Sequence, residues 1–213
     1  MRPLTPLYAI VDAAVAARAG YQPEALAAAF LAGGVGTLQI RAKDLDSGPF
    51  LDLCTAIVAL ARPYGASIVV NDRADIARLA GADGVHVGQE DLTPADARTL
   101  LGPDAIVGLS THTLAQIEHA RGEPISYLAV GPVFGTQTKS TGYDAVGVAL
   151  VERAVAAAGD LPVVAIGGIT IDRARAVLGA GAASVAVITD LVVTGDPEAR
   201  AAEYVRQLGL AKG

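Results

Sequence analysis

A chain of 213 residues with 52% hydrophobic and only 18% charged residues can bury a large core, and it has too little polarity for a long disordered segment. Its net charge of -6 argues against a general nucleic-acid surface, because contacts to a phosphate backbone normally need a basic face. No apolar run reaches the roughly 18 residues needed to span a bilayer, and the first residues lack the apolar stretch of a signal peptide. We therefore expect a cytoplasmic protein of one domain, residues 1–213, with neither nucleic-acid nor membrane partners.

Eight short apolar runs, most of them rich in β-branched residues, recur along the chain and predict β-strands. In chain order they are LYAIVD from Leu7, TLQIRA from Thr37, SIVVND from Ser67, GVHVG from Gly84, AIVGLS from Ala105, YLAVGPV from Tyr127, PVVAIGG from Pro162 and SVAVIT from Ser184. Several are almost continuously hydrophobic, as parallel strands are when both of their faces are covered.

The segments between the runs carry the start and stop signals of helices. A capping residue stands one or two positions before a proline at Ser47, Thr93 and Asp196. Glycines follow the alanine-rich helical patterns and fit a left-handed helix stop: Gly33, Gly81, Gly179 and Gly181.

Strand–helix units with a mean spacing of about 25 residues predict an α/β fold, a single (βα)8 TIM barrel with its active site at the C-terminal ends of the strands. A doubly wound open sheet is the alternative. It usually has fewer strands and often a glycine-rich fingerprint after the first one, which LYAIVDAAV lacks.

Polar residues that end or follow the runs are candidates for the site. In chain order they are Gln39, Arg41, Lys43, Asn71, Asp72, Asp91, Ser110, Thr136, Thr138, Lys139, Gly167, Gly168 and Thr189. Helix capping could explain Asp72, Ser110 or Thr189 alone. All of these positions nevertheless converge on one rim of the predicted barrel, which favours a shared site.

Three cations at strand ends predict a local anion site in this acidic chain. Gln39, Arg41 and Lys43 alternate along the second run, so their side chains share one side of it. Arg41 can grip a phosphate through paired donors, whereas Lys43 and Lys139 act as mobile point charges. A single lysine of this kind would more often be an ordinary surface charge.

Asp72 and Asp91 would repel a phosphate unless a cation lies between them and it. Mg2+ commonly takes one or two carboxylates together with phosphate oxygens, and the absence of a neighbouring Cys or His cluster favours it over zinc. The two aspartates could instead serve as a general acid and base, although nearby cations would keep both ionised.

The segment IGGI, residues 166–169, suggests a second anion site. Backbone N–H groups of the loops after the seventh and eighth strands form the usual phosphate site of such barrels, so Gly168, Ile188 and Thr189 could bind a monophosphate. The glycine pair could also serve only a tight turn.

The remaining titratable candidates carry weaker signals. Cys54 lies on the inward face of a predicted helix and is expected to be inert core. His86 lies inside a strand run and is expected to be a hydrogen-bonded core residue rather than a base. His112 is either a cap neighbour or a ligand contact, and His119 is expected on the surface.

The ordered motifs LQIRAKD, VVNDRADIA, GADGVHVGQEDL, GLSTH, YLAVGPVFGTQTK, VVAIGGI and SVAVIT resemble the thiamine-phosphate synthase family over nearly the whole chain. The resemblance implies a (βα)8 barrel that joins a hydroxymethylpyrimidine diphosphate to a thiazole monophosphate and releases diphosphate with the help of one Mg2+ per subunit. The sequence of this chain departs from the usual family pattern at AVITD, where a small, serine-containing turn is more typical.

The resemblance also implies roles for individual residues. The pyrimidine diphosphate would be bound by Gln39, Ile40, Arg41, Ala42, Lys43, Asn71, Ser110 and Lys139. The thiazole phosphate would be bound by Thr136, Gln137, Thr138, Gly168, Ile188 and Thr189. Asp72 and Asp91 would hold Mg2+, and the catalytic set would be Arg41, Lys43, Ser110 and Lys139.

Two other functions remain open at this point. A thiazole tautomerase shares the barrel and the thiazole phosphate but expels no diphosphate, so it would have little use for Asp72, Asp91 and Lys139 together. A sensor that binds phosphorylated ligands without turnover is the other alternative. Exposed helix faces could also form a homodimer.

Overall fold

The computed structural model describes residues 4–135 and 147–209. Four residues that the sequence assigns to the site lie outside the described residues: Thr136, Gln137, Thr138 and Lys139.

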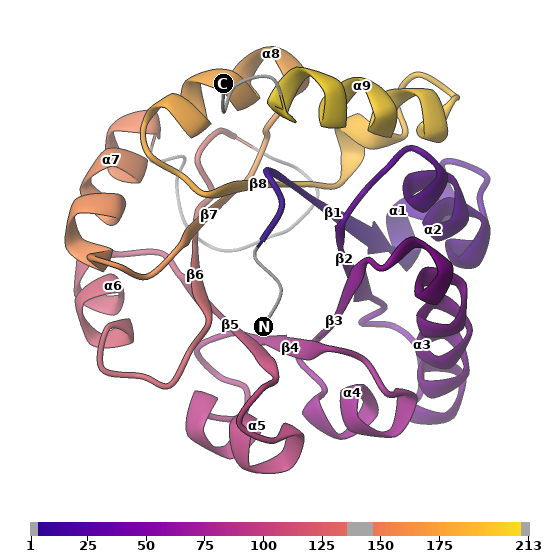
Figure 1. Cartoon of the computed structure of the whole chain (residues 1–213), viewed down its shortest axis with the longest axis horizontal. Helices are drawn as coiled ribbons and strands as arrows, with labels where there is room; N and C mark the ends of the chain where they lie inside the picture. The colour runs from indigo at the N-terminus through magenta and orange to yellow at the C-terminus, as the bar shows by residue number, and fades with distance from the viewer. Residues whose placement is uncertain (1–3, 136–146, 210–213) are drawn as a thin grey trace.

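Eight parallel strands of the described chain close into a barrel, in sequence order, with β1 paired to β8 (Figure 1). The strands are β1 (Leu7–Asp12), β2 (Thr37–Arg41), β3 (Ser67–Asn71), β4 (Gly84–Val87), β5 (Ile106–Thr111), β6 (Tyr127–Val130), β7 (Val163–Ile166) and β8 (Ser184–Val187). All eight predicted strands are confirmed, and the closed barrel excludes the open-sheet alternative.

Helices surround the barrel as an outer ring (Figure 1). They are α1 (Ala13–Arg18), α2 (Pro23–Ala32), α3 (Ser47–Ala61), α4 (Ala74–Ala80), α5 (Pro94–Leu101), α6 (Leu114–Ala120), α7 (Gly147–Ala158), α8 (Ile171–Gly179) and α9 (Pro197–Gly209), with the short 3-10 helices η1 (Arg62–Tyr64) and η2 (Thr189–Leu191). Within residues 4–135 and 147–209, none of these helices has the length and apolarity to cross a membrane.

The predicted helix starts are close to those observed. Thr93 caps α5 by accepting a hydrogen bond from the Asp96 N–H at 3.1 Å. Asp196 accepts one from the Ala199 N–H at 3.0 Å at the start of α9. For α3 the cap is Asp46, one residue before the predicted Ser47.

The predicted glycine stops are only partly correct. Gly81 and Gly181 have positive φ angles of 68° and 98°. Gly33 has φ -70° and is not left-handed, and Gly179 is the last residue of α8. Gly33 is needed for a different reason: a Cβ there would lie 2.7 Å from the Ala201 Cβ, so a larger residue would push α9 away from α2.

Two apolar clusters result from the alternation of side chains along the strands. The barrel interior holds Tyr8, Ile10, Val69, Ile106, Tyr127, Ala129, Val164 and Ala186. The layer between the barrel and the helices holds the outward strand residues together with the inner helix faces. Cys54 belongs to this layer, where burial raises the pKa of its thiol to about 12, so the predicted inert core position is confirmed.

Candidate active site

A cavity of about 780 Å³ opens at the C-terminal ends of the strands. Every strand of the barrel or the loop after it contributes to its lining. In chain order the polar and glycine contributors include Tyr8, Gln39, Arg41, Lys43, Asn71, Asp72, His86, Asp91, Ser110, His112, Tyr127, Gly167, Gly168, Thr170, Arg173, Thr189 and Asp190. The predicted rim residues that the structure describes therefore share one concave surface.

Arg41 is held by a carboxylate that the sequence reasoning missed. Its Nη1 donates to Asp12 Oδ2, and the other Asp12 oxygen accepts from the Val15 N–H at 3.0 Å, which caps α1. The Asp12 side chain is 3% exposed and that of Arg41 16%. The Arg41 Nε is buried and has no hydrogen-bond partner within the described part of the chain. Arg41 thus has a fixed orientation, and the exposed part of its side chain lines the cavity.

Lys43, Asp72 and Asp91 form a charged group at the ends of β2, β3 and β4. Lys43 Nζ lies 3.1 Å from Asp72 Oδ2. Asp91 Oδ2 accepts from the Gly88 N–H at 2.7 Å. Burial raises the pKa of the Asp72 carboxyl, Lys43 lowers it, and the adjacent Asp91 carboxylate raises it, with a net upward direction. Two carboxylates with one lysine leave a negative charge that suits a hard divalent cation.

No group of three or more Cys, His, Asp or Glu side chains suited to a metal occurs in residues 4–135 and 147–209. The donor set at Asp72 and Asp91 is therefore two carboxylates without nitrogen or sulfur. This fits Mg2+, which takes few protein ligands and keeps water or phosphate oxygens.

Asp72 has an uncommon backbone conformation. Its φ of 64° makes it the one non-glycine residue of the described chain in the left-handed region. The Asp72 N–H donates to the His86 carbonyl at 2.8 Å, which ties the turn after β3 to β4. Asp72 does not cap α4, because the cap position is Arg73 and no side chain caps that helix. Capping is thus wrong as the explanation for this aspartate.

A chain of hydrogen bonds crosses the barrel interior below the cavity. Gln39 Nε2 donates to the Tyr8 hydroxyl at 3.1 Å, and the hydroxyls of Tyr8 and Tyr127 lie 2.9 Å apart. Tyr127 is 3.0 Å from His86 Nδ1, and His86 Nε2 is 2.8 Å from Ser110 Oγ. His86 is therefore hydrogen-bonded and 8% exposed, as predicted.

This chain has two consistent directions of donation. With Gln39 Nε2 donating to Tyr8, the hydroxyls donate onward to His86 Nδ1, and His86 Nε2–H donates to Ser110. The Ser110 hydroxyl is then a donor toward the cavity, while the buried Gln39 Oε1, which has no partner among the described residues, is an acceptor. In the reverse direction Ser110 would donate to His86 and Tyr8 would donate to Gln39. Because Gln39 Nε2 donates to Tyr8, the contact belongs to the first arrangement.

Glycines after β7 allow the loops of β6 and β7 to pack closely. A Cβ on Gly167 would lie 2.6 Å from Pro132 Cα, and one on Gly168 would lie 2.6 Å from the Gly135 carbonyl oxygen. Their φ angles are 107° and 58°. Arg173, another residue missed from sequence, donates to the Gly168 carbonyl at 2.8 Å and stacks over the Phe134 ring at 4.6 Å. A cation thus stands beside the predicted monophosphate loop.

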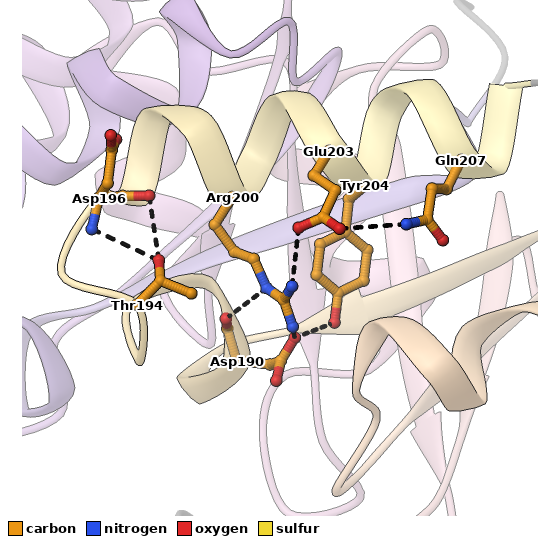
Figure 2. A network of polar contacts seen from close by, with 7 residues as sticks. All are labelled: Asp190, Thr194, Asp196, Arg200, Glu203, Tyr204 and Gln207. Carbon is orange, nitrogen blue, oxygen red and sulfur yellow. Dashed lines mark hydrogen bonds and ion pairs between the residues drawn. The ribbon is translucent and has the colours of Figure 1, made fainter.

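The turn after β8 is held by α9, as Figure 2 shows. Arg200 Nη2 donates to Asp190 Oδ2 at 2.7 Å, and the Tyr204 hydroxyl donates to the same oxygen at 2.6 Å. Ile188 and Thr189, which precede Asp190, both line the cavity. No pattern in the sequence linked Asp190 to α9, because the partners lie on a helix ten and more residues further along the chain.

Two residues predicted to contact the pyrimidine diphosphate do not face the cavity. The side chains of Ile40 and Ala42 are 0% and 6% exposed and lie in the layer between barrel and helices. The alternation that brings Gln39 and Arg41 inward turns their neighbours outward. Of the other histidines, His112 lines the cavity with Nδ1 2.7 Å from the Gly131 carbonyl, and His119 is a surface residue as predicted.

Comparisons with known proteins agree on one family. The family model described as thiamine monophosphate synthase matches residues 7–191. A thiamine-phosphate synthase of Anaeromyxobacter dehalogenans is 45% identical over 183 residues, which cover 86% of this chain and 82% of that protein. One of Thermus thermophilus is 46% identical over 177 residues, covering 83% and 84%. The solved thiamine phosphate pyrophosphorylase from Pyrococcus furiosus superposes with a TM-score of 0.86 at 30% identity, covering 97% and 96% of the two chains.

Proposed function

This chain belongs to the thiamine monophosphate synthase family and is a transferase, and we propose that it joins an aminopyrimidine methyl diphosphate to a thiazole monophosphate to form thiamine phosphate. In the proposed reaction the carbon–oxygen bond between the pyrimidine methylene and the diphosphate breaks, and the diphosphate leaves with the electron pair. The thiazole ring nitrogen then forms the new bond to that methylene carbon.

The single observation that carries this proposal is the composition of the cavity rim. Arg41 and Lys43 lie beside the carboxylates of Asp72 and Asp91 at one end, and the glycine loop with Arg173 lies at the ends of β7 and β8. One end suits a diphosphate with a divalent cation, and the other suits a monophosphate.

The residues of the diphosphate end would act mainly through electrostatics. Arg41, fixed by Asp12, and Lys43, beside Asp72, would stabilise negative charge that grows on the departing diphosphate. Mg2+, when held by Asp72 and Asp91, would offset further charge on the leaving group. The proposed partners are thus phosphorylated small molecules, with Mg2+ as the cofactor.

The interior chain would orient the pyrimidine rather than move protons. A donor hydroxyl on Ser110 complements the ring-nitrogen acceptor of an aminopyrimidine, and the buried Gln39 would act from below by holding the Tyr8 hydroxyl. Burial raises the pKa of Tyr8 to about 12, so it stays protonated at neutral pH. The thiazole nitrogen carries no proton to remove, so positioning is the main task of these groups.

The paired Asp72 and Asp91 beside Lys43 favour the synthase over a tautomerase, which has no diphosphate to expel. A sensor without turnover is separated from both by an assay. We expect the purified protein to release diphosphate only when both substrates and Mg2+ are present.

Asp72→Asn is the variant that tests the metal end, because asparagine keeps the size of the side chain and tolerates the left-handed backbone. Loss of the charge should lower turnover by about 100-fold or more, as for removal of a strong electrostatic stabiliser. Asp52→Asn on the exposed side of α3 is the matched control and should behave like the parent. Near-parent turnover of Asp72→Asn at limiting Mg2+ would contradict the metal role.

A further inference from the structure

The wall of the cavity after β8 contains a carboxylate where a phosphate is expected. Asp190 directly follows Ile188 and Thr189 and lines the same cavity. An exposed carboxylate there would repel a phosphate monoester. Its side chain is only 11% exposed, and its contacts run toward α9 (Figure 2).

Arg200 compensates the charge of Asp190 and also contacts its backbone. Nη2 of Arg200 donates to Oδ2 at 2.7 Å, and Nε donates to the Asp190 carbonyl at 3.3 Å. One planar guanidinium therefore holds both the side chain and the main chain of the turn. This is a geometry that a lysine could not reproduce.

Tyr204 and Glu203 complete the cluster on successive positions of α9. The Tyr204 hydroxyl donates to Asp190 Oδ2 at 2.6 Å, and burial together with this carboxylate raises the pKa of Tyr204, so the phenol stays a donor. Arg200 Nη1 donates to Glu203 at 2.8 Å on the more exposed side, where the Glu203 side chain is 34% exposed. The Arg200 side chain itself is 14% exposed.

We propose that Arg200 is a positioning residue for the phosphate of the thiazole substrate, acting through Asp190: it fixes the turn after β8 and cancels the Asp190 charge, so that this wall accepts an anion. The inference rests on the proposed function, since it names what shapes the monophosphate end of the same site. Of the residues concerned, Asp190 is the last residue of the segment AVITD, residues 186–190.

A purely structural role is the alternative, in which the cluster only fastens α9 to the barrel. The two roles differ in what they do to ligands. A fastening role changes the affinity for a thiazole phosphate and for the corresponding unphosphorylated alcohol alike, or changes neither. A positioning role changes the affinity for the phosphate alone.

Calorimetric titration of both thiazoles into Arg200→Gln is therefore the test. We expect the preference for the phosphate over the alcohol to fall by about tenfold or more, because an uncompensated carboxylate then lies in the wall. The KM of the pyrimidine diphosphate should stay within about twofold of the parent value. An equal loss of affinity for the thiazole phosphate and the alcohol, or no loss of affinity for either, overturns the proposal.

Second variants test whether Arg200 acts through Asp190. Asp190→Asn combined with Arg200→Gln removes both charges and should restore the phosphate preference to within about threefold of the parent. A double variant as impaired as Arg200→Gln contradicts the proposed route. Glu203→Gln removes only the outer contact of Arg200 and is the matched control, with a phosphate preference like that of the parent.

Asp190→Asn alone provides the test if Arg200→Gln does not fold. It keeps the size of the side chain, so the phosphate preference should remain within about threefold or increase; a larger loss overturns the proposal. The outcomes also separate the two levels of inference. A parent protein that binds no thiazole phosphate refutes the proposed function, whereas normal binding in the parent with an unchanged preference in all variants refutes only the role of Arg200.

Discussion

At the scale of single residues, the site depends on carboxylates that orient cations. Asp12 is the clearest case, because one of its oxygens caps α1 while the other binds Arg41. The buried pair couples the first helix of the chain to the predicted diphosphate end. A buried carboxylate such as Asp12 fixes the orientation of the arginine more than it raises the affinity for an anion, because its own charge partly cancels that of the arginine.

Asp12→Asn separates these two tasks. Asparagine is as good a cap as aspartate, so α1 should keep its start, whereas loss of one partner of a buried ion pair should lower the free energy of unfolding. Arg41 loses its charged partner and its fixed direction, and we expect kcat/KM for the pyrimidine diphosphate to fall by about tenfold, with KM for the thiazole phosphate unchanged. Steady-state kinetics with each substrate varied in turn check this. Asp75→Asn, which breaks the exposed pair with Arg73, should leave both parameters unchanged; a drop of the same size there would point to a general charge effect.

Many residues of the rim could be predicted from the sequence, whereas Arg173 on the rim and most of the residues that support it could not. Gln39, Arg41 and Lys43 could be predicted to share the cavity because side chains alternate along a strand. Applied strictly, the same alternation would have placed Ile40 and Ala42 outside it. Asp12 was also within reach, since LYAIVD ends on it. The partners of Asp190 on α9 were not, because contacts between distant segments leave no periodic signal.

At the scale of elements, β4, β5 and β6 share the space inside the barrel through one glycine. A Cβ on Gly108 of β5 would lie 2.2 Å from the Tyr127 ring and 2.5 Å from His86 Nδ1. The interior hydrogen-bond chain therefore exists only because β5 has no side chain at that level. From the sequence, Gly108 was only one residue of a predicted strand, and nothing indicated that two aromatic rings occupy the space beside it.

Gly108→Ala should consequently affect both folding and activity. Overpacking at such a site costs about 1–3 kcal/mol of the free energy of unfolding, and the displaced Tyr127 and His86 should disturb Ser110, lowering turnover. Urea denaturation and the diphosphate assay measure the two effects. Gly48→Ala in α3 is the control, because nothing lies within 4 Å of the Cβ that it adds. This variant should have a free energy of unfolding that is higher by about 0.5–1 kcal/mol. An unchanged denaturation midpoint for Gly108→Ala would show that the rings can move aside.

At the scale of the whole molecule, the fold was more predictable than the site. Continuous apolar runs with helical segments between them indicate a sheet covered on both faces, and eight such units favour a closed barrel over an open sheet. What the pattern could not supply were the local exceptions: the additional helix α1 directly after β1, and the turn η2 after β8. The turn η2 lies at the cavity, and α1 is capped by the same Asp12 carboxylate that holds Arg41, so contacts between neighbouring elements decide both conformations.

The filled barrel interior also makes global stability sensitive to alkaline pH. Burial raises the pKa of Tyr8 from 10.0 to about 12. Its contribution is fully present below pH 10 and is lost as the pH rises through the folded-state value, because the unfolded chain ionises first. Tyr8 alone should cost about 2 kcal/mol of the free energy of unfolding between pH 9 and pH 12.

Denaturation with urea across this pH range checks the Tyr8 effect by difference. Tyr8→Phe should reduce the loss of stability between pH 9 and pH 12 by that amount. Tyr64→Phe, at a side chain that is 55% exposed, should leave the pH dependence of the parent unchanged. Identical slopes for the parent and Tyr8→Phe would mean that Tyr8 ionises in the folded protein as readily as in the unfolded chain.

The left-handed backbone conformation of Asp72, at the proposed diphosphate end of the cavity, lowers the stability of the folded protein. Glycine adopts φ near 64° freely, whereas a residue with a Cβ is strained there by about 1 kcal/mol. A search for heat-resistant variants that ignored catalysis would therefore favour Asp72→Gly, and with it the loss of a proposed magnesium ligand. At this position thermal robustness and chemistry are competing objectives, so improvement of the one has to be sought elsewhere in the barrel if the other is to be kept.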